Sequence, residues 1–228
     1  MELSIDTSTR YASVALTNEG ALLAETSWYS QQNHTVELAP AVQRLLEQVH
    51  ATPADVKALF VALGPGGFSA LRVGLGFAKG LAEGLGVPVV GVGTLEVEAF
   101  PYAATGLPVY PVSDAGRAQL AWASFSLAGE QWSKTQDEAI GTPQQLAESV
   151  HAPAVLCGEG LAIHAQALRA LLPAGVLMAD APPPTRRAAT LARLGWRRLA
   201  RGERDDATTL QPLYLRRPTI TLPGGRRE

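Results

Sequence analysis

The segment 63–86, which reads LGPGGFSALRVGLGFAKGLAEGLG, most constrains how this 228-residue chain can fold. It follows a strand-like apolar run from Lys57, turns at residues 64–68, and continues into a predicted helix that begins at Ser69. A strand, a glycine turn and a helix start often form an anion site, because the first N–H groups of the helix lack partners. The segment is therefore a candidate ligand loop.

The helix predicted after this turn contains several glycines, each of which costs about 0.8–1 kcal/mol relative to alanine in a helix interior. Gly76, Gly80 and Gly84 recur every four residues, so they share one face of the helix. A face without side chains lets another element approach closely. The segment is thus also a candidate packing surface, and the two interpretations compete.

The turn departs from the known phosphate-binding patterns. The run GPGGFSA lacks both the lysine of GxxxxGK[ST] and the spacing of GxGxxG. Lys79 lies ten residues past Ser69, about 15 Å along the helix axis, which is too far to hold a phosphate at the loop. Ser69 is explained as a helix N-cap and Cys157 as an apolar strand residue, so no catalytic residue is predicted.

Composition places the chain among globular proteins. Hydrophobic residues make up 46% and charged residues 18%, and the single cysteine excludes an internal disulfide. The N-terminus lacks the pattern of a signal peptide, and no apolar run reaches the ~18 residues of a membrane span. We therefore expect a cytoplasmic protein without a membrane segment.

The order of predicted elements occurs twice along the chain. The first series consists of strands at 3–8, 11–16 and 21–28, a helix at 34–50, a strand at 57–63, the glycine-rich helix and a strand at 88–92. The second consists of strands at 107–112, 119–125 and 131–135, a helix at 142–150, a strand at 154–157, a helix at 161–172 and a strand at 175–178. This repetition predicts two related α/β lobes, 1–104 and 105–228, each a mixed sheet flanked by helices. A C-terminal helix and tail, 185–217, could pack back on the first lobe, and disorder is expected beyond Pro218.

The helix 34–50 has an apolar stripe formed by Leu38, Val42, Leu45 and Val49. Two further apolar residues off this stripe, Val36 and Leu46, give the helix a second edge that could face a partner or the second lobe.

His34 and Glu37 are three residues apart and could both bind a metal. The remaining histidines are scattered along the chain, so no metal site is predicted.

Asp6 ends the first strand and precedes small hydroxyl residues. Such an acid faces the phosphates in actin-like and sugar-kinase-like ATPases, whereas in other turns it caps its neighbours. Both interpretations stay open. Asp114 occupies the corresponding position in the second lobe, at the end of its first strand.

Basic residues concentrate at the C-terminus. From Thr185 onward there are eleven arginines and four acidic residues, a net charge of +7, which leaves −9 for the rest because the whole chain carries −2. One face of the last predicted helix carries an arginine stripe, formed by Arg186, Arg193, Arg197, Arg201 and Arg204. Such a stripe is either a solvated face or a contact for nucleic acid or a protein partner.

Six motifs follow one another along the chain: IDTS at 5–8, NHT at 33–35, GPGGFSALRVG at 64–74, AKGL at 78–81, PVVGV at 88–92 and YLR at 214–216. Together they resemble the TsaB (YeaZ) family. The resemblance runs in order along the whole chain. The family's usual GPGSFTGLRIG differs here at Gly67, Ser69, Ala70 and Val73, and its DARRGEVY-like segment is altered at 114–121.

The resemblance implies an actin-like, Hsp70-like (ribonuclease H-like) fold and a non-catalytic paralogue of TsaD. It implies a scaffold that helps TsaD to place a threonylcarbamoyl group on the adenosine next to the tRNA anticodon, with the ATPase TsaE as third component. The resemblance implies neither a metal nor a cofactor. It also implies that this chain contacts tRNA only as part of the complex.

The resemblance also implies that the two first-lobe helices contact TsaD or a second copy of the chain, which would give a homodimer. The residues expected at this interface are Leu38, Val42, Leu45, Val73, Gly76, Phe77 and Gly80. The sequence leaves open which of them face TsaD, a second copy of the chain or the chain's own sheet. Two alternatives remain: an ATPase, kinase or metallopeptidase-like enzyme of the same fold, which relies on Asp6 and the glycine loop, and direct tRNA binding through the arginine stripe.

Overall fold

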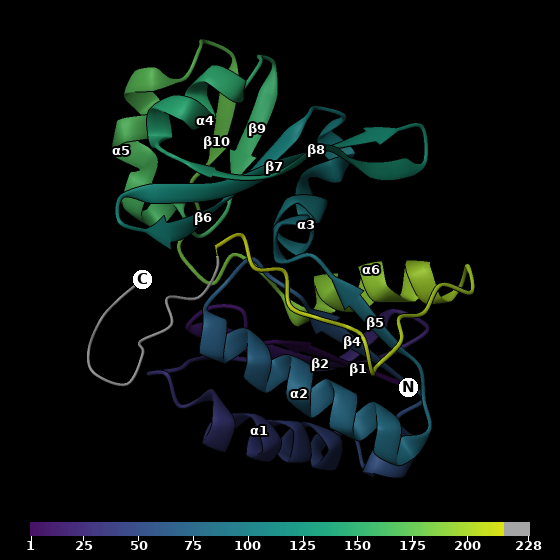
Figure 1. The fold of residues 1–228 in the computed structure, drawn as a ribbon. Coiled ribbons are helices and arrows are strands. Elements are labelled where there is room, and N and C mark those ends of the chain that lie inside the picture. The colour runs from purple at the N-terminus through teal and green to yellow at the C-terminus, as the bar shows by residue number, and fades with distance from the viewer. Residues whose placement is uncertain (217–228) are drawn as a thin grey trace.

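The computed structural model of the chain describes residues 1–216, which form two lobes, each built on a five-stranded sheet (Figure 1). The disorder expected beyond Pro218 lies outside the described residues. The first sheet has the order β3-β2-β1-β4-β5, with β1–β2–β3 antiparallel and β4 and β5 parallel to β1. Its strands are β1 (Glu2–Asp6), β2 (Tyr11–Asn18), β3 (Ala21–Tyr29), β4 (Ala58–Ala62) and β5 (Val89–Val92).

The second sheet has the same arrangement, in the order β10-β9-β6-β7-β8. Three consecutive antiparallel strands are again followed by two parallel ones. Its strands are β6 (Val109–Gly116), β7 (Gln119–Ala128), β8 (Gln131–Gly141), β9 (Ala154–Cys157) and β10 (Val176–Ala179). The repeated order predicted from the sequence is therefore present in the fold.

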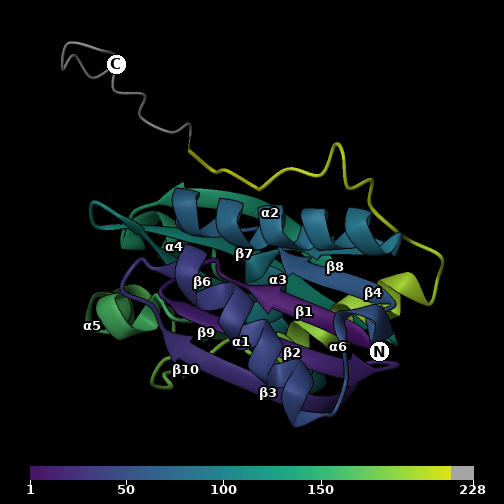
Figure 2. The ribbon, with the colours of Figure 1, turned by 90° about the horizontal axis from the view of Figure 1, so that it is seen from below.

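Helices cover both faces of the first sheet. On one face, α1 (His34–Gln48) and α2 (Phe68–Leu85) lie side by side over a core that includes Leu3 and Ile5 (Figure 2). On the other face, α6 (Ala188–Leu199) packs against β1, β2 and β5, burying Phe60 of β4. Strand β4 is wholly buried, which explains its continuous run of apolar residues.

The second sheet is covered by α4 (Pro143–Ser149) and α5 (Leu161–Leu171) on one face, and by α3 (Thr94–Ala99) on the other. Thr142 caps α4 as its Thr-Pro start predicts, because its hydroxyl accepts from the N–H of Gln145 at 3.3 Å. Two short 3₁₀ helices, η1 (Pro53–Asp55) and η2 (Phe100–Thr105), complete the described elements.

After α6 the chain runs back along the first lobe as an extended segment (Figure 1). The N–H of Asp205 donates to the carbonyl of Val89 at 2.9 Å, and the N–H of Leu213 donates to Leu63 at 2.7 Å. Lys79 of α2 donates to two carbonyls of this segment. Lys79 therefore anchors the C-terminal segment, at a distance from the glycine turn.

Two helix starts differ from the sequence-based expectation. Helix α2 begins at Phe68 with Gly67 as N-cap, because the N–H of Leu71 already donates to the carbonyl of Gly67 at 2.9 Å. Ser69 is thus not the cap. Helix α6 begins at Ala188, with Arg187 as an extended N-cap residue, and residues 185–187 lie outside any helix. Among residues 1–216, no helix is long and apolar enough to cross a membrane.

Candidate functional site

The glycine turn closes on the chain's own β1–β2 turn. A Cβ atom on Gly66 would lie 2.2 Å from the carbonyl oxygen of Ser8, and one on Gly74 would lie 2.3 Å from Oγ1 of Thr7. The Thr7 hydroxyl donates to the carbonyl of Ala70 at 2.7 Å. These two glycines are therefore explained by close internal packing, although Gly66 and Gly67 also line the cleft between the lobes that is described below.

The other glycines of α2 have a different environment. Cβ atoms added to Gly76, Gly80 or Gly84 would meet nothing within 4 Å, and all three residues are exposed. They form what we call the glycine face of α2. Their helix-breaking tendency is not offset by any packing within residues 1–216.

The structure divides the residues expected at a partner interface into two groups. Leu38, Val42 and Leu45 of α1 are buried in the first lobe's own core, so they offer no surface to a partner. This corrects their expected role, because the apolar stripe of α1 faces its own sheet. The other four expected residues lie on α2: Val73 and Phe77 are half-buried at the edge of that core, and Gly76 and Gly80 are exposed.

The two residues of the second apolar edge expected for α1 differ in burial. Leu46 is buried with the stripe, whereas Val36 is 71% exposed.

A buried arginine joins the two lobes. Arg186, two residues before α6, donates through Nε to Asp6 Oδ2 at 2.9 Å and through Nη1 to Glu98 Oε2 at 3.2 Å. Its Nη1 also lies 3.1 Å from Oε1 of Glu159, in the turn between β9 and α5 of the second lobe. The expectation that Arg186 belongs to an exposed stripe is therefore wrong: its side chain is buried among three carboxylates.

Asp6 is fully engaged by protein groups. One carboxylate oxygen pairs with Arg186, and the other accepts from the N–H and the hydroxyl of Ser8. Asp6 therefore caps its turn and forms a buried ion pair. Asp114, at the matching place in the second lobe, is more exposed and pairs instead with His164, 3.1 Å from its Nε2. The two lobes thus share a topology without sharing this chemistry.

Burial changes the titration of the groups around Arg186. It raises the pKa of Glu98, although the charge of Arg186 opposes the rise. Burial also disfavours the charged form of Arg186, but the charges of Asp6, Glu159 and Glu98 outweigh it and raise the pKa of the guanidinium. Burial, followed by the charge of Glu98, raises the pKa of the Cys157 thiol well above its usual value. The expected burial of Cys157 is confirmed, and its thiolate is disfavoured.

Replacing Glu98 with glutamine is expected to change how stability depends on pH. The folded-state pKa of Glu98 is raised above the unfolded value of about 4.3. Its stabilising contribution is therefore complete below that value and is lost as pH rises through the folded pKa. Glutamine stays neutral, so the free energy of unfolding of the variant should increase relative to the parent as pH rises above about 4.3 through the folded-state pKa of Glu98.

Urea unfolding at several pH values measures this difference. The matched control is Glu83→Gln, which makes the same change on the exposed side of α2, outside the cluster. A difference between Glu98→Gln and the parent that does not change with pH would show that burial does not control this carboxyl group.

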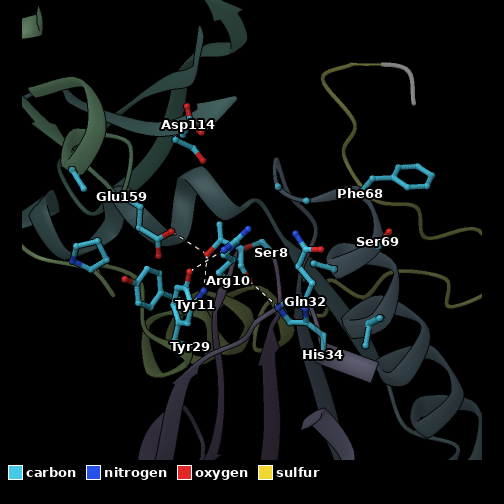
Figure 3. A pocket seen from close by; sticks show the side chains of 18 of the residues that line it. Ser8, Arg10, Tyr11, Tyr29, Gln32, His34, Phe68, Ser69, Asp114 and Glu159 are labelled. Carbon is cyan, nitrogen blue, oxygen red and sulfur yellow. Dashed lines mark hydrogen bonds between the residues drawn. The ribbon is translucent and has the colours of Figure 1, made fainter. Parts of the chain in front are cut away.

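A cleft of about 820 Å³ opens between the lobes beside this cluster (Figure 3). Asp114 and Glu159 of the second lobe lie on one side of it, and Gln32, His34 and Ser69 of the first lobe on the other.

Several polar groups of the cleft already have partners within the chain. Arg10 donates to the hydroxyl of Tyr29 at 3.0 Å, and Nε2 of His34 lies 2.9 Å from the carbonyl oxygen of Thr9. Within the described residues, no three histidine, cysteine, aspartate or glutamate side chains converge as metal ligands would.

The sequence did not reveal the Arg186 cluster, since its members lie far apart along the chain. Two weak signals existed. Glu98 stands within the otherwise apolar run 97–100, and Glu159 lies between two glycines. Acidic residues in such settings are good candidates for buried partners, but neither signal identifies which cation they meet.

Comparisons with known proteins agree with this architecture. A family model described as "TsaD: tRNA N6-adenosine threonylcarbamoyltransferase" matches residues 27–182. The Bacillus subtilis (strain 168) "tRNA threonylcarbamoyladenosine biosynthesis protein TsaB" is 30% identical over 217 residues, which cover 94% of this chain and 93% of the relative.

Among solved structures, "YeaZ from Pseudomonas aeruginosa" has a TM-score of 0.77 and 27% identity, covering 94% of this chain and all of that one. The ethanolamine utilization protein EutJ from Carboxydothermus hydrogenoformans is 12% identical, with a TM-score of 0.51, over 85% of this chain and 90% of that one. At that identity the likeness concerns the fold alone.

Two lobes with sheets of the same strand order, each flanked by helices, define a two-lobed α/β protein of the actin-like class. This confirms the fold class predicted from the sequence. Within this class, the chain belongs to the TsaB (YeaZ) family, as its motifs indicate.

Proposed function

We propose that this chain is a non-catalytic scaffold and activator subunit of the bacterial tRNA threonylcarbamoyladenosine-modifying complex. It binds TsaD through the glycine face of α2, and TsaE is the third component. The observation that carries the proposal is the open face formed by Gly76, Gly80 and Gly84, on a helix of a family whose relatives are named for this biosynthesis.

The cost of the three glycines to the helix and the absence of side chains on this face both favour a contact surface for a partner. Three helix-interior glycines together forfeit roughly 2–3 kcal/mol relative to alanines, and no internal packing offsets this in residues 1–216. A partner helix can approach such a face closely, and the half-buried Val73 and Phe77 contribute apolar contacts at its edge. Binding would then stabilise the active conformation of TsaD by mass action.

The non-catalytic part of the proposal is supported by the environment of the two features that favoured an enzyme. Both oxygens of Asp6 are bonded to protein groups, and the glycine turn packs on Ser8. Calorimetry of the isolated chain with ATP and magnesium tests this directly. Micromolar binding or turnover would support an ATPase or kinase instead.

Replacing Gly80 with leucine is expected to weaken association with TsaD by about 5- to 150-fold, since a side chain on the glycine face would hold the partner away. Such overpacking costs about 1–3 kcal/mol, and 1.4 kcal/mol corresponds to a tenfold change. The fold should survive, because a Cβ atom at residue 80 meets nothing within 4 Å. Co-expression with TsaD of the same organism, followed by pull-down and titration, measures the effect.

The matched control is Ala167→Leu, which adds a leucine to an exposed position of α5 in the second lobe and should leave binding unchanged. A folded Gly80→Leu protein that binds TsaD as well as the parent would place the contact elsewhere. A second copy of the chain is the competing occupant of this face. Light scattering of the isolated chain shows whether Gly80→Leu also dissociates such a homodimer.

A further inference from the structure

A groove of about 680 Å³ lies on the other side of the first lobe, away from the glycine face. It runs between α6, η2 and the tip of the β7–β8 hairpin, and its walls include Arg193 and Arg197. We propose that this groove binds the phosphate backbone of a looped RNA segment. That the RNA is the tRNA substrate rests on the proposed function, whereas phosphate binding rests on the groove itself.

The structure separates neutralised from uncompensated arginines in this part of the chain. Arg186 is buried among carboxylates, Arg187 pairs with Glu25, and Arg198 pairs with Glu203. Within residues 1–216, Arg193 and Arg197 border the groove and have no carboxylate at ion-pair distance; Arg197 donates to the backbone carbonyl of Glu130, which also borders the groove, at 3.3 Å. Two positive charges four residues apart repel each other, so their placement favours an external anion.

An aromatic ring holds these two arginines in place. The guanidinium carbons of Arg193 and Arg197 each lie 5.4 Å from the ring centroid of Phe100. Phe100 is itself buried and packs edge-on against Trp132 at 5.6 Å. Cation–π contacts of this kind orient a guanidinium without neutralising it. The pair is therefore preorganised and retains its full charge.

The chemistry of the groove favours RNA over an acidic peptide. The planar donors of arginine match phosphate oxygens in bidentate geometry. Arginines at i and i+4 have Cβ atoms about 5–6 Å apart, which suits an anion repeated at short, regular intervals. The groove also exposes apolar surface, including Leu22, which is 47% exposed, and Pro101. Unstacked bases of an RNA loop can cover such a surface.

The charge distribution of the chain also favours RNA binding on the side of α6. The residues before Thr185 carry a net charge of −9 and would repel RNA, whereas residues 185–201, which contain α6, include six arginines and no acidic residue. An RNA that approaches this protein is therefore attracted to the α6 side. That side is remote from the glycine face, because α2 and α6 cover opposite faces of the first sheet (Figure 1).

The test is fluorescence anisotropy of a labelled tRNA transcript with the isolated full-length chain, titrated between about 50 and 200 mM salt. For Arg193→Gln/Arg197→Gln we expect affinity to fall at least tenfold at the lowest salt. The slope of log K against log salt should decrease by about 1.4, from two lost contacts at roughly 0.7 each. The control Arg44→Gln/Arg117→Gln removes the same charge from exposed positions outside the groove and should retain most of the binding.

The proposal is overturned if the parent chain does not bind the transcript, if the groove variant keeps the parent's affinity and slope, or if the control loses as much. Labelled polyglutamate that binds the parent but not the groove variant, with RNA binding unaffected, would assign the groove to an acidic protein partner. The two proposals fail separately. Gly80→Leu should keep RNA binding by the isolated chain, and the groove variant should still associate with TsaD.

Discussion

Replacing Arg186 with leucine is expected to lower the free energy of unfolding by about 3–5 kcal/mol, the usual effect of removing one partner from a buried ion pair. The variant would leave the carboxylates of Asp6, Glu98 and Glu159 buried without their cation. Because Asp6 belongs to the first lobe and Glu159 to the second, the loss also releases a contact that fixes the lobes relative to each other.

Urea unfolding at neutral pH measures the effect of Arg186→Leu. The matched control is Arg201→Leu, whose side chain is 61% exposed and lies 3.9 Å from Glu203; it should change stability by less than about 1 kcal/mol. Adding Asp6→Asn to Arg186→Leu should recover part of the loss, because one uncompensated charge is removed. A loss similar to that of the control would mean that the cluster contributes little.

The same substitution, glycine to alanine, is expected to have opposite effects in α6 and α2. At Gly195 a Cβ atom would lie 2.4 Å from Cγ of Phe60, a fully buried ring in β4. Overpacking of this kind typically costs about 1–3 kcal/mol, so Gly195→Ala should destabilise the protein despite the better helix propensity of alanine. At Gly80 the space is open, and Gly80→Ala should stabilise by about 0.5–1 kcal/mol.

Both alanine variants are compared with the parent in one denaturation series, and the sign of each change decides the outcome. If Gly195→Ala is neutral, α6 can shift on the sheet and its packing is looser than the contact with Phe60 indicates. If Gly80→Ala lowers stability in the isolated chain, residue 80 is covered within the protein, and the glycine face is not free to meet TsaD.

The fold was largely predictable because its signals are local. Alternating and 3.6-residue apolar patterns, together with glycine and proline at turns, indicate most strands and helices, and their repeated order predicts the two lobes. The family motifs are likewise contiguous, so they were visible in the sequence.

The site was less predictable because its contacts are remote. Arg186 and Asp6 are 180 positions apart, and no periodicity relates them. Helical spacing predicted that Arg186 and Arg193 share one face, but residues 185–187 precede the helix and the side chain of Arg186 is buried.

The apolar stripe of α1 shows a second limit. Leu38, Val42 and Leu45 have the spacing that either a core or a docking surface would show, and only the position of the sheet decides between them. The glycines of α2 show the same limit, since Gly74 and Gly76 look alike in sequence yet one is tightly packed and the other open.

The return of α6 to the first lobe bears on how the protein is made. During synthesis, residues 1–104 leave the ribosome with Phe60 and Val90 still uncovered, because Leu191 and Leu194, which pack against that face, come about a hundred residues later. The second sheet has no such dependence, since β6 to β10 and α3 to α5 all precede residue 180. The lobe that is translated first is thus the one that is completed last, and its unfinished face is a natural target for chaperones that bind nascent chains.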